Sequence, residues 1–186
     1  MTLALLIFLF PLAYSPGPGN MFFAANGARF GFWATVPANI GYHIATWLIT
    51  VAVGAGLLAV FSDYPMVFLI LRIAGALYVL WLAWGLFNAG PAGAVGAAKG
   101  AGFWDGVVLL LLNPKAYVLM ALIYSQFGAH GQVIWIATVF TANNIVAFCL
   151  FAWVGEMISS RFAAGPWGNR LLGAMLAVVA VWMLFL

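Results

Sequence analysis

The scarcity of charge is the feature that most limits what this chain can fold into. Six Lys and Arg and three acidic residues make up only 5% of the 186 residues, whereas soluble proteins carry roughly a quarter. Nine charged residues are too few for a water-soluble surface. The chain is therefore predicted to be a multi-spanning membrane protein. The apolar runs are long and show no strand-like alternation, which indicates helices rather than a barrel. The expected fold class is therefore all-α and integral to the membrane.

Several apolar runs are long enough for a helix to cross the bilayer, which takes about 20 residues. Six are expected, at 2–30 (interrupted), 33–60, 65–88, 103–127, 131–155 and 169–186. The first is kept as a span because it lacks the basic start and the small-residue cleavage site of a signal peptide. The longer joint 89–102 is rich in Gly, Ala and Pro, which is typical of a linker between two halves.

The two halves of the chain resemble each other. Aligned without a gap, 71–87 and 169–185 match at Arg72 and Arg170, Gly75 and Gly173, Ala76 and Ala174, and Trp84 and Trp182; Asn39 also matches Asn144. The expected organisation is a three-helix repeat over 1–90, a linker over 91–102 and a second three-helix repeat over 103–186. Because three is odd, the second repeat enters from the opposite side. Inverted repeats of this kind recur in secondary transporters.

The basic residues predict the orientation. The joints after spans one, three and five carry Arg29, Lys99, Arg161 and Arg170, beside Asp105 and Glu156, whereas the opposite face offers Asp63, His130 and Arg72. The positive-inside rule counts Lys and Arg, and it places the first group in the cytoplasm and both termini outside. The net charge of +3 is therefore interpreted as a topology signal, and no nucleic-acid partner is expected.

Two helix breaks lie in the middle of spans one and four, at 15-SPGPGN-20 and 112-LNPKA-116. Proline removes a backbone donor and favours the first turn of a new helix, and Asn or Ser favours the N-cap before it. Asn113–Pro114 fits this pattern, as does either Ser15–Pro16 or Gly17–Pro18. Each break is predicted to start a half-helix whose N-terminus faces the membrane interior and can bind a carboxylate. The alternative is that both prolines only kink their helices.

Lys115 and His43 are ionisable residues predicted to lie deep in the membrane. A lysine at mid-span costs on the order of 2.5–3.5 kcal/mol and usually faces a cavity or a partner. Lys115 either caps carbonyls of the first break or meets a substrate carboxylate, and the two states can alternate during transport. His43 is either a buried neutral histidine with a hydrogen bond or a proton-coupling group.

Paired polar residues complete the predicted site. Asn39 and Asn144 suit a lining around a substrate ammonium or the bent backbones. The full set of predicted substrate-binding residues is Pro16, Gly17, Pro18, Gly19, Asn20, Asn39, Asn113, Pro114, Lys115 and Asn144. The chain has no P-loop, no Cys/His cluster and no protease or lipase motif, so no ATP drive, cofactor, metal or enzymatic activity is expected.

The two break segments resemble the signatures of the LysE/RhtB amino-acid efflux family. The first carries the "PGP" signature, and 103-FWDGVVLLLLNPKAYVLMALIYSQF-127 resembles the second, with "NPK" followed by an apolar run ending in "QF". The resemblance covers essentially the whole chain. It implies a proton-driven exporter of amino acids or close derivatives in the bacterial inner membrane, and a homodimer. The residues that carry over are Pro16, Gly17, Pro18, Asn113, Pro114 and Lys115. Pro37, Gly41 and His43 depart from the pattern of many relatives in span two.

A different class of function stays open on the residues alone. The chain could be a membrane-embedded structural or assembly subunit, or a small channel, whose breaks only bend helices. Water access to the breaks separates these alternatives from a transporter.

Overall fold

The computed structural model describes residues 2–56, 65–88, 100–128, 131–162 and 166–185, and these residues form helices and no strand. The helices are α1 (Thr2–Ala13), α2 (Pro18–Phe30), the short 3₁₀ helix η1 (Phe32–Thr35), α3 (Val36–Gly54), α5 (Pro65–Phe87), α6 (Phe103–Leu111), α7 (Pro114–Phe127), α8 (Val133–Phe162) and α9 (Pro166–Met183). The all-helical class is confirmed. Positions 91–99 of the expected linker, and Asp63, Lys99 and His130 of the orientation argument, lie outside the described residues.

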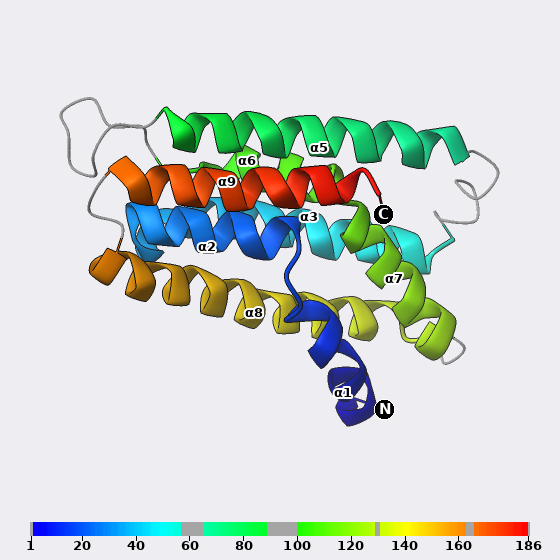
Figure 1. The fold of residues 1–186 in the computed structure, drawn as a ribbon. Helices are drawn as coiled ribbons and strands as arrows, with labels where there is room; N and C mark the ends of the chain where they lie inside the picture. The colour runs from blue at the N-terminus through cyan, green and yellow to red at the C-terminus, as the bar shows by residue number, and fades with distance from the viewer. Residues whose placement is uncertain (1, 57–64, 89–99, 129–130, 163–165, 186) are drawn as a thin grey trace.

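Two of the predicted spans are bent helix pairs. α1 and α2 meet at 67°, and α6 and α7 meet at 64°. In Figure 1, α2, α3, α5, α8 and α9 run alongside one another, whereas α1 and α7 turn away from this group beyond the breaks. α2 packs along α8, α5 along α9, and α6 along α3. The bends therefore separate one tightly packed end of the molecule from an end where α1 and α7 diverge.

Large apolar side chains cover the outside of the helices as well as the core. They recur at helical spacing on the outer faces, as at Ile40, Ile44 and Leu48 of α3 and at Leu171, Met175, Val178 and Trp182 of α9. A soluble helix would place polar residues on such a face, whereas a helix that is apolar on all sides suits lipid. Among the described residues, Phe32–Gly54 and Val133–Ile158 are long and apolar enough to cross a membrane, and the number rises to as many as four if each bent pair is one span. The six predicted spans stay a prediction. α5 and α9 contribute shorter apolar stretches, Leu69–Gly85 and Arg170–Met183.

The packed end is held by two reciprocal contacts between glycines and backbone carbonyls. Gly27 of α2 lies against the Ala152 carbonyl of α8, and Gly155 of α8 lies against the Ala24 carbonyl of α2. Close approach at small residues is a common way to pack helices in lipid, and each Cα–H···O contact contributes about 0.5–1 kcal/mol. A methyl group on either glycine would overlap the facing carbonyl oxygen. We call this pair of contacts the α2–α8 interlock.

The same arrangement joins α3 and α6. Gly41 of α3 lies against the Phe103 carbonyl, and Gly106 of α6 lies against the Ala38 carbonyl. In both pairs the glycine and the facing carbonyl on one helix are three residues apart. This α3–α6 interlock lies at the same end as the first, because α2 ends, and α3 and α6 begin, at that end (Figure 1).

Gly27→Ala is expected to destabilise the protein by about 1–3 kcal/mol, because the added methyl group overlaps the Ala152 carbonyl and forces two helices apart. Thermal unfolding of the purified protein in detergent measures this effect. Gly85→Ala is the matched control, since Gly85 lies within α5 with nothing within 4 Å of the added carbon. Because alanine forms helices better than glycine does, the melting temperature of Gly85→Ala is expected to stay the same or to rise slightly. Equal losses in both variants would contradict the interlock.

Candidate functional site

The first break begins where α1 ends at Ala13 and closes where α2 starts at Pro18. Gly17 is the N-cap, so the Gly17–Pro18 alternative is the one that the structure adopts. Side chains satisfy the carbonyls that the break exposes: Ser15 Oγ donates to the Leu12 carbonyl at 2.9 Å, and Asn20 Nδ2 donates to the Ala13 carbonyl at 2.9 Å. This agrees with the requirement that freed backbone groups in lipid find protein partners.

The second break has the predicted backbone arrangement but not the predicted cap. Asn113 occupies the N-cap position before Pro114, yet its side chain makes no capping hydrogen bond. Instead Asn113 Nδ2 donates to the Tyr42 hydroxyl of α3 at 2.9 Å. Asn113 is 3% exposed, and its Oδ1 has no hydrogen-bond partner among the described residues. The side chain ties the break to α3 and leaves a buried acceptor unused.

Lys115 joins the two breaks. Its Nζ donates to the Ser15 carbonyl at 2.8 Å and to Ser15 Oγ at 2.9 Å. Gly17 makes room for it, since a Cβ at that position would lie 2.7 Å from Lys115 Cδ. Of the two predicted states of Lys115, the structure shows the one in which the lysine caps a carbonyl of the first break. The two breaks, which lie in different halves of the chain, therefore meet.

Four of the predicted site residues line one central cavity. Its lining is Ala13, Asn20, Tyr42, Asn113, Lys115, Ala116, Leu119, Asn144 and Phe148, and its volume is about 10 Å³. A volume of this order holds about one water molecule. Phe148 and Tyr42 fill much of the space, with ring centroids 4.7 Å apart. In this conformation the site has no room for an amino acid.

Other predicted residues lie at the edge of this cavity or away from it. Gly19 is buried against the Phe148 ring, where a Cβ would approach to 2.5 Å. Pro16 is exposed and lies between the ends of α1 and α2. Asn39 does not line the cavity, and its Nδ2 lies 3.9 Å from Cys149 Sγ.

His43 adopts the geometry of a buried histidine with a hydrogen bond. It is 4% exposed, its Nδ1 lies 2.8 Å from the Asn39 carbonyl, and its ring packs 5.1 Å from Phe148. Because a carbonyl can only accept, Nδ1 carries the proton in this contact. His43 lines a separate apolar groove with Thr141 rather than the central cavity. Its predicted role in proton coupling remains a prediction.

Sequence reasoning missed Tyr42 and Phe148. Tyr42 adjoins His43 and lies three residues after Asn39, two positions predicted to be functional, so its neighbourhood was a usable signal. The sequence holds no such signal for Phe148, because nothing in it distinguishes this residue among the sixteen phenylalanines. No group of three or more His, Cys, Asp or Glu that could hold a metal occurs in the part of the chain that the structure describes.

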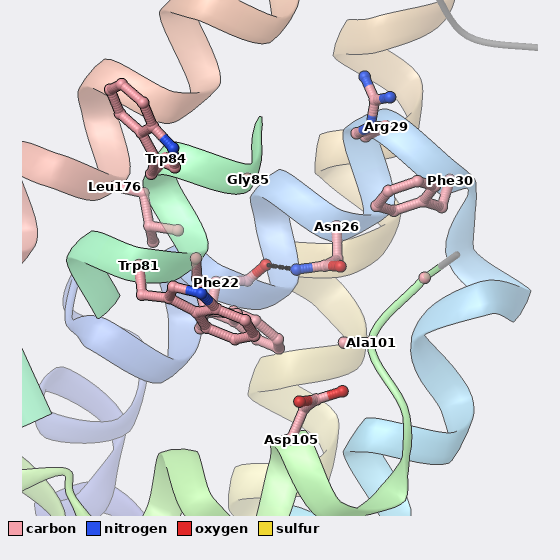
Figure 2. A pocket seen from close by; sticks show the side chains of 12 residues that line it. Phe22, Asn26, Arg29, Phe30, Trp81, Trp84, Gly85, Ala101, Asp105 and Leu176 are labelled. Atoms are coloured by element: carbon pink, nitrogen blue, oxygen red, sulfur yellow. Dashed lines mark hydrogen bonds between the residues drawn. The ribbon is translucent and has the colours of Figure 1, made fainter. Parts of the chain in front are cut away.

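A larger cavity of about 270 Å³ lies between α2, α5, α6 and α9, at the interlocked end (Figure 2). Phe22, Asn26, Arg29, Phe30, Trp81, Leu82, Trp84, Gly85, Gly100, Ala101, Asp105 and Leu176 line it. None of these residues belongs to the predicted substrate site. Asp105 Oδ2 accepts from the Gly102 amide at 2.8 Å, and Oδ1 accepts from the Tyr78 hydroxyl at 3.2 Å. We call this cavity the vestibule.

Tyr42→Phe is expected to cost about 1–3 kcal/mol of stability, because it leaves the buried Asn113 amide without its acceptor. Thermal unfolding in detergent checks this. The Asn113→Leu, Tyr42→Phe double variant removes both partners and should lose less than the two single losses added together. Strict additivity would show that the hydrogen bond contributes little.

Comparison with known proteins identifies relatives along almost the whole chain. A family model described as LysE type translocator matches residues 10–185. A cysteine/O-acetylserine efflux protein of Klebsiella pneumoniae is 27% identical over 188 residues, covering 96% of this chain and 94% of the relative. A homoserine/homoserine lactone efflux protein of Salmonella typhimurium is 31% identical over 123 residues, covering 62% of this chain and 59% of the relative. No solved structure matches.

Proposed function

Because the chain belongs to the LysE type translocator family, whose members are translocators and not enzymes, we propose that it exports amino acids or close derivatives across the bacterial inner membrane. The relatives named for efflux of cysteine/O-acetylserine and of homoserine/homoserine lactone support this substrate class. Cysteine, O-acetylserine and homoserine carry an ammonium and a carboxylate on the same carbon, whereas homoserine lactone carries only the ammonium. We expect the proposed site to bind both charges of the first three.

The contact of Lys115 with Ser15 is the observation that carries the proposal. A lysine that caps a carbonyl in the empty site can exchange that neutral acceptor for a substrate carboxylate, which makes a stronger, charge-assisted hydrogen bond. The N-termini of α2 and α7 start at the same breaks and favour an anion there. The unpartnered Asn113 Oδ1 supplies an acceptor for the ammonium. The site then binds both ends of the zwitterion.

Transport would proceed by alternating access between two inverted repeats with three spans each. The similar bends in α1–α2 and α6–α7 support the repeat. The two interlocks close one end, whereas α1 and α7 diverge at the other (Figure 1). With the closed end in the cytoplasm and both termini outside, as the basic residues predict, this conformation is closed toward the cytoplasm. Proton drive, with His43 as the coupling group, and a homodimer complete the proposal.

Lys115→Ala is expected to abolish efflux while the protein still inserts in the membrane. The reason is that the substrate carboxylate loses its only positively charged partner in the lining of the central cavity. Cells loaded with dipeptides that contain homoserine or cysteine, and expressing each variant, provide the measurement. The amount of protein in the membrane is quantified alongside.

Ser15→Ala is the matched control for Lys115→Ala. It removes the Oγ acceptor but leaves the Ser15 carbonyl, so Lys115 stays at the break and efflux should persist. Efflux at the wild-type level from a well-expressed Lys115→Ala, Pro114→Ala double variant would overturn the site assignment.

Water access separates the transporter from a structural subunit or a channel. In a Cys149→Ser background, Ala116→Cys places a thiol in the lining of the central cavity. An exporter should show labelling by a soluble maleimide that changes when substrate is added, because the central cavity opens to each side in turn. No labelling under any condition favours the structural subunit, and unchanging labelling from both sides favours a channel. Position 19 is unsuitable for this test, since a Cβ there overlaps the Phe148 ring.

A further inference from the structure

The volumes of the two cavities pose a problem for a single-site transporter. The central cavity holds about 10 Å³ and the vestibule about 270 Å³. Pockets for drug-sized ligands start at roughly 300 Å³, so the vestibule suits a smaller solute. The two cavities share α2, with Asn20 bordering the first and Phe22 and Asn26 the second. Of these two cavities, the vestibule is the one with room for a small solute in this conformation.

The vestibule combines opposite charges with an apolar wall. Asp105 contributes a carboxylate from α6, and Arg29, which is 8% exposed, contributes a guanidinium from α2. Figure 2 shows Asp105 at one end of the cavity and Arg29 at the other, with Asn26 between them. Trp81 of α5 and Phe22 of α2 add aromatic surface to the lining. The faces of indole rings also attract an ammonium group.

Asp105 keeps binding capacity beyond its structural contacts. The Gly102 amide donates to Oδ2 of Asp105, and the Tyr78 hydroxyl donates to Oδ1. An ionised carboxylate offers about four lone-pair positions, so it can accept from a further donor. These two contacts also hold the carboxylate in a fixed orientation at the start of α6, which lowers the entropic cost of binding a ligand there.

We propose that the vestibule is a second binding site for a zwitterionic amino acid, occupied before the central cavity opens. The ammonium lies against Asp105 and the side chain packs against Trp81 and Phe22, while the carboxylate points along the vestibule toward the end where Arg29 lies. This inference rests on the proposed function. On the predicted orientation, the vestibule faces the compartment from which an exporter takes its substrate.

Equilibrium binding of radiolabelled homoserine to the purified protein in detergent tests the proposal. Asp105→Asn keeps an oxygen that can accept from the Gly102 amide but removes the charge, so binding should weaken about tenfold, as expected for one charge-assisted hydrogen bond. Tyr78→Phe removes one support of Asp105 while leaving its charge, so binding should weaken less than in Asp105→Asn. Lys115→Ala should still bind, although it does not transport.

Two tryptophan variants provide a second test, in case Asp105→Asn loses binding because it misfolds. Trp81→Ala removes an indole from the vestibule and should weaken binding, whereas Trp104→Ala removes another exposed indole that does not line it and should not. Wild-type binding in both Asp105→Asn and Trp81→Ala would overturn the proposal. So would a Lys115→Ala variant that no longer binds, because the central cavity would then be the binding site.

Efflux assays distinguish this inference from the proposed function. If wild-type cells export no amino acid although the purified protein binds homoserine in the vestibule, the exporter assignment fails and the binding site stands. If wild-type cells export and Asp105→Asn cells do so with an unchanged half-saturating concentration, the exporter stands and the vestibule site fails.

Discussion

In a bilayer, every backbone group that leaves a helical ladder must find another protein group. This requirement explains why the two breaks carry the polar residues that they do. Ser15, Asn20 and Lys115 all make hydrogen bonds to carbonyls near the end of α1. The bond from Lys115 crosses between the two halves of the chain. The same hydrogen bonds therefore satisfy the first break and hold the two halves together at the middle of the molecule.

The rest of the fold is arranged around this junction. On one side, the interlocks bring α2 against α8 and α6 against α3 at glycines, so the helices meet through backbone with little side chain between them. On the other side, α1 and α7 turn away by more than 60° from their partner half-helices. A molecule that is tight at one end and divergent at the other has the asymmetry that a transporter needs in each of its end states. The central cavity lies between, filled by Tyr42 and Phe148.

Much of the fold could be predicted because lipid leaves few choices. Low charge and long apolar runs led to an all-helical membrane protein, and proline with its N-cap residue located both breaks within a residue or two. The side-chain contacts could not be predicted. Asn113 has the sequence signature of a cap, yet it bonds Tyr42 because a buried hydroxyl from α3 lies within reach. The vestibule was missed because Arg29 and Asp105 are far apart in the sequence and were interpreted only as topology signals.

The interlocks also bear on how the chain is assembled. Each one joins two helices that are far apart in the sequence, so neither can form until α6 or α8 has been synthesised. α2 is thirteen residues long, too short to cross the bilayer alone, and it leaves the ribosome long before its partner α8. The glycine face of α2 is therefore complete before the helix that covers it has been made.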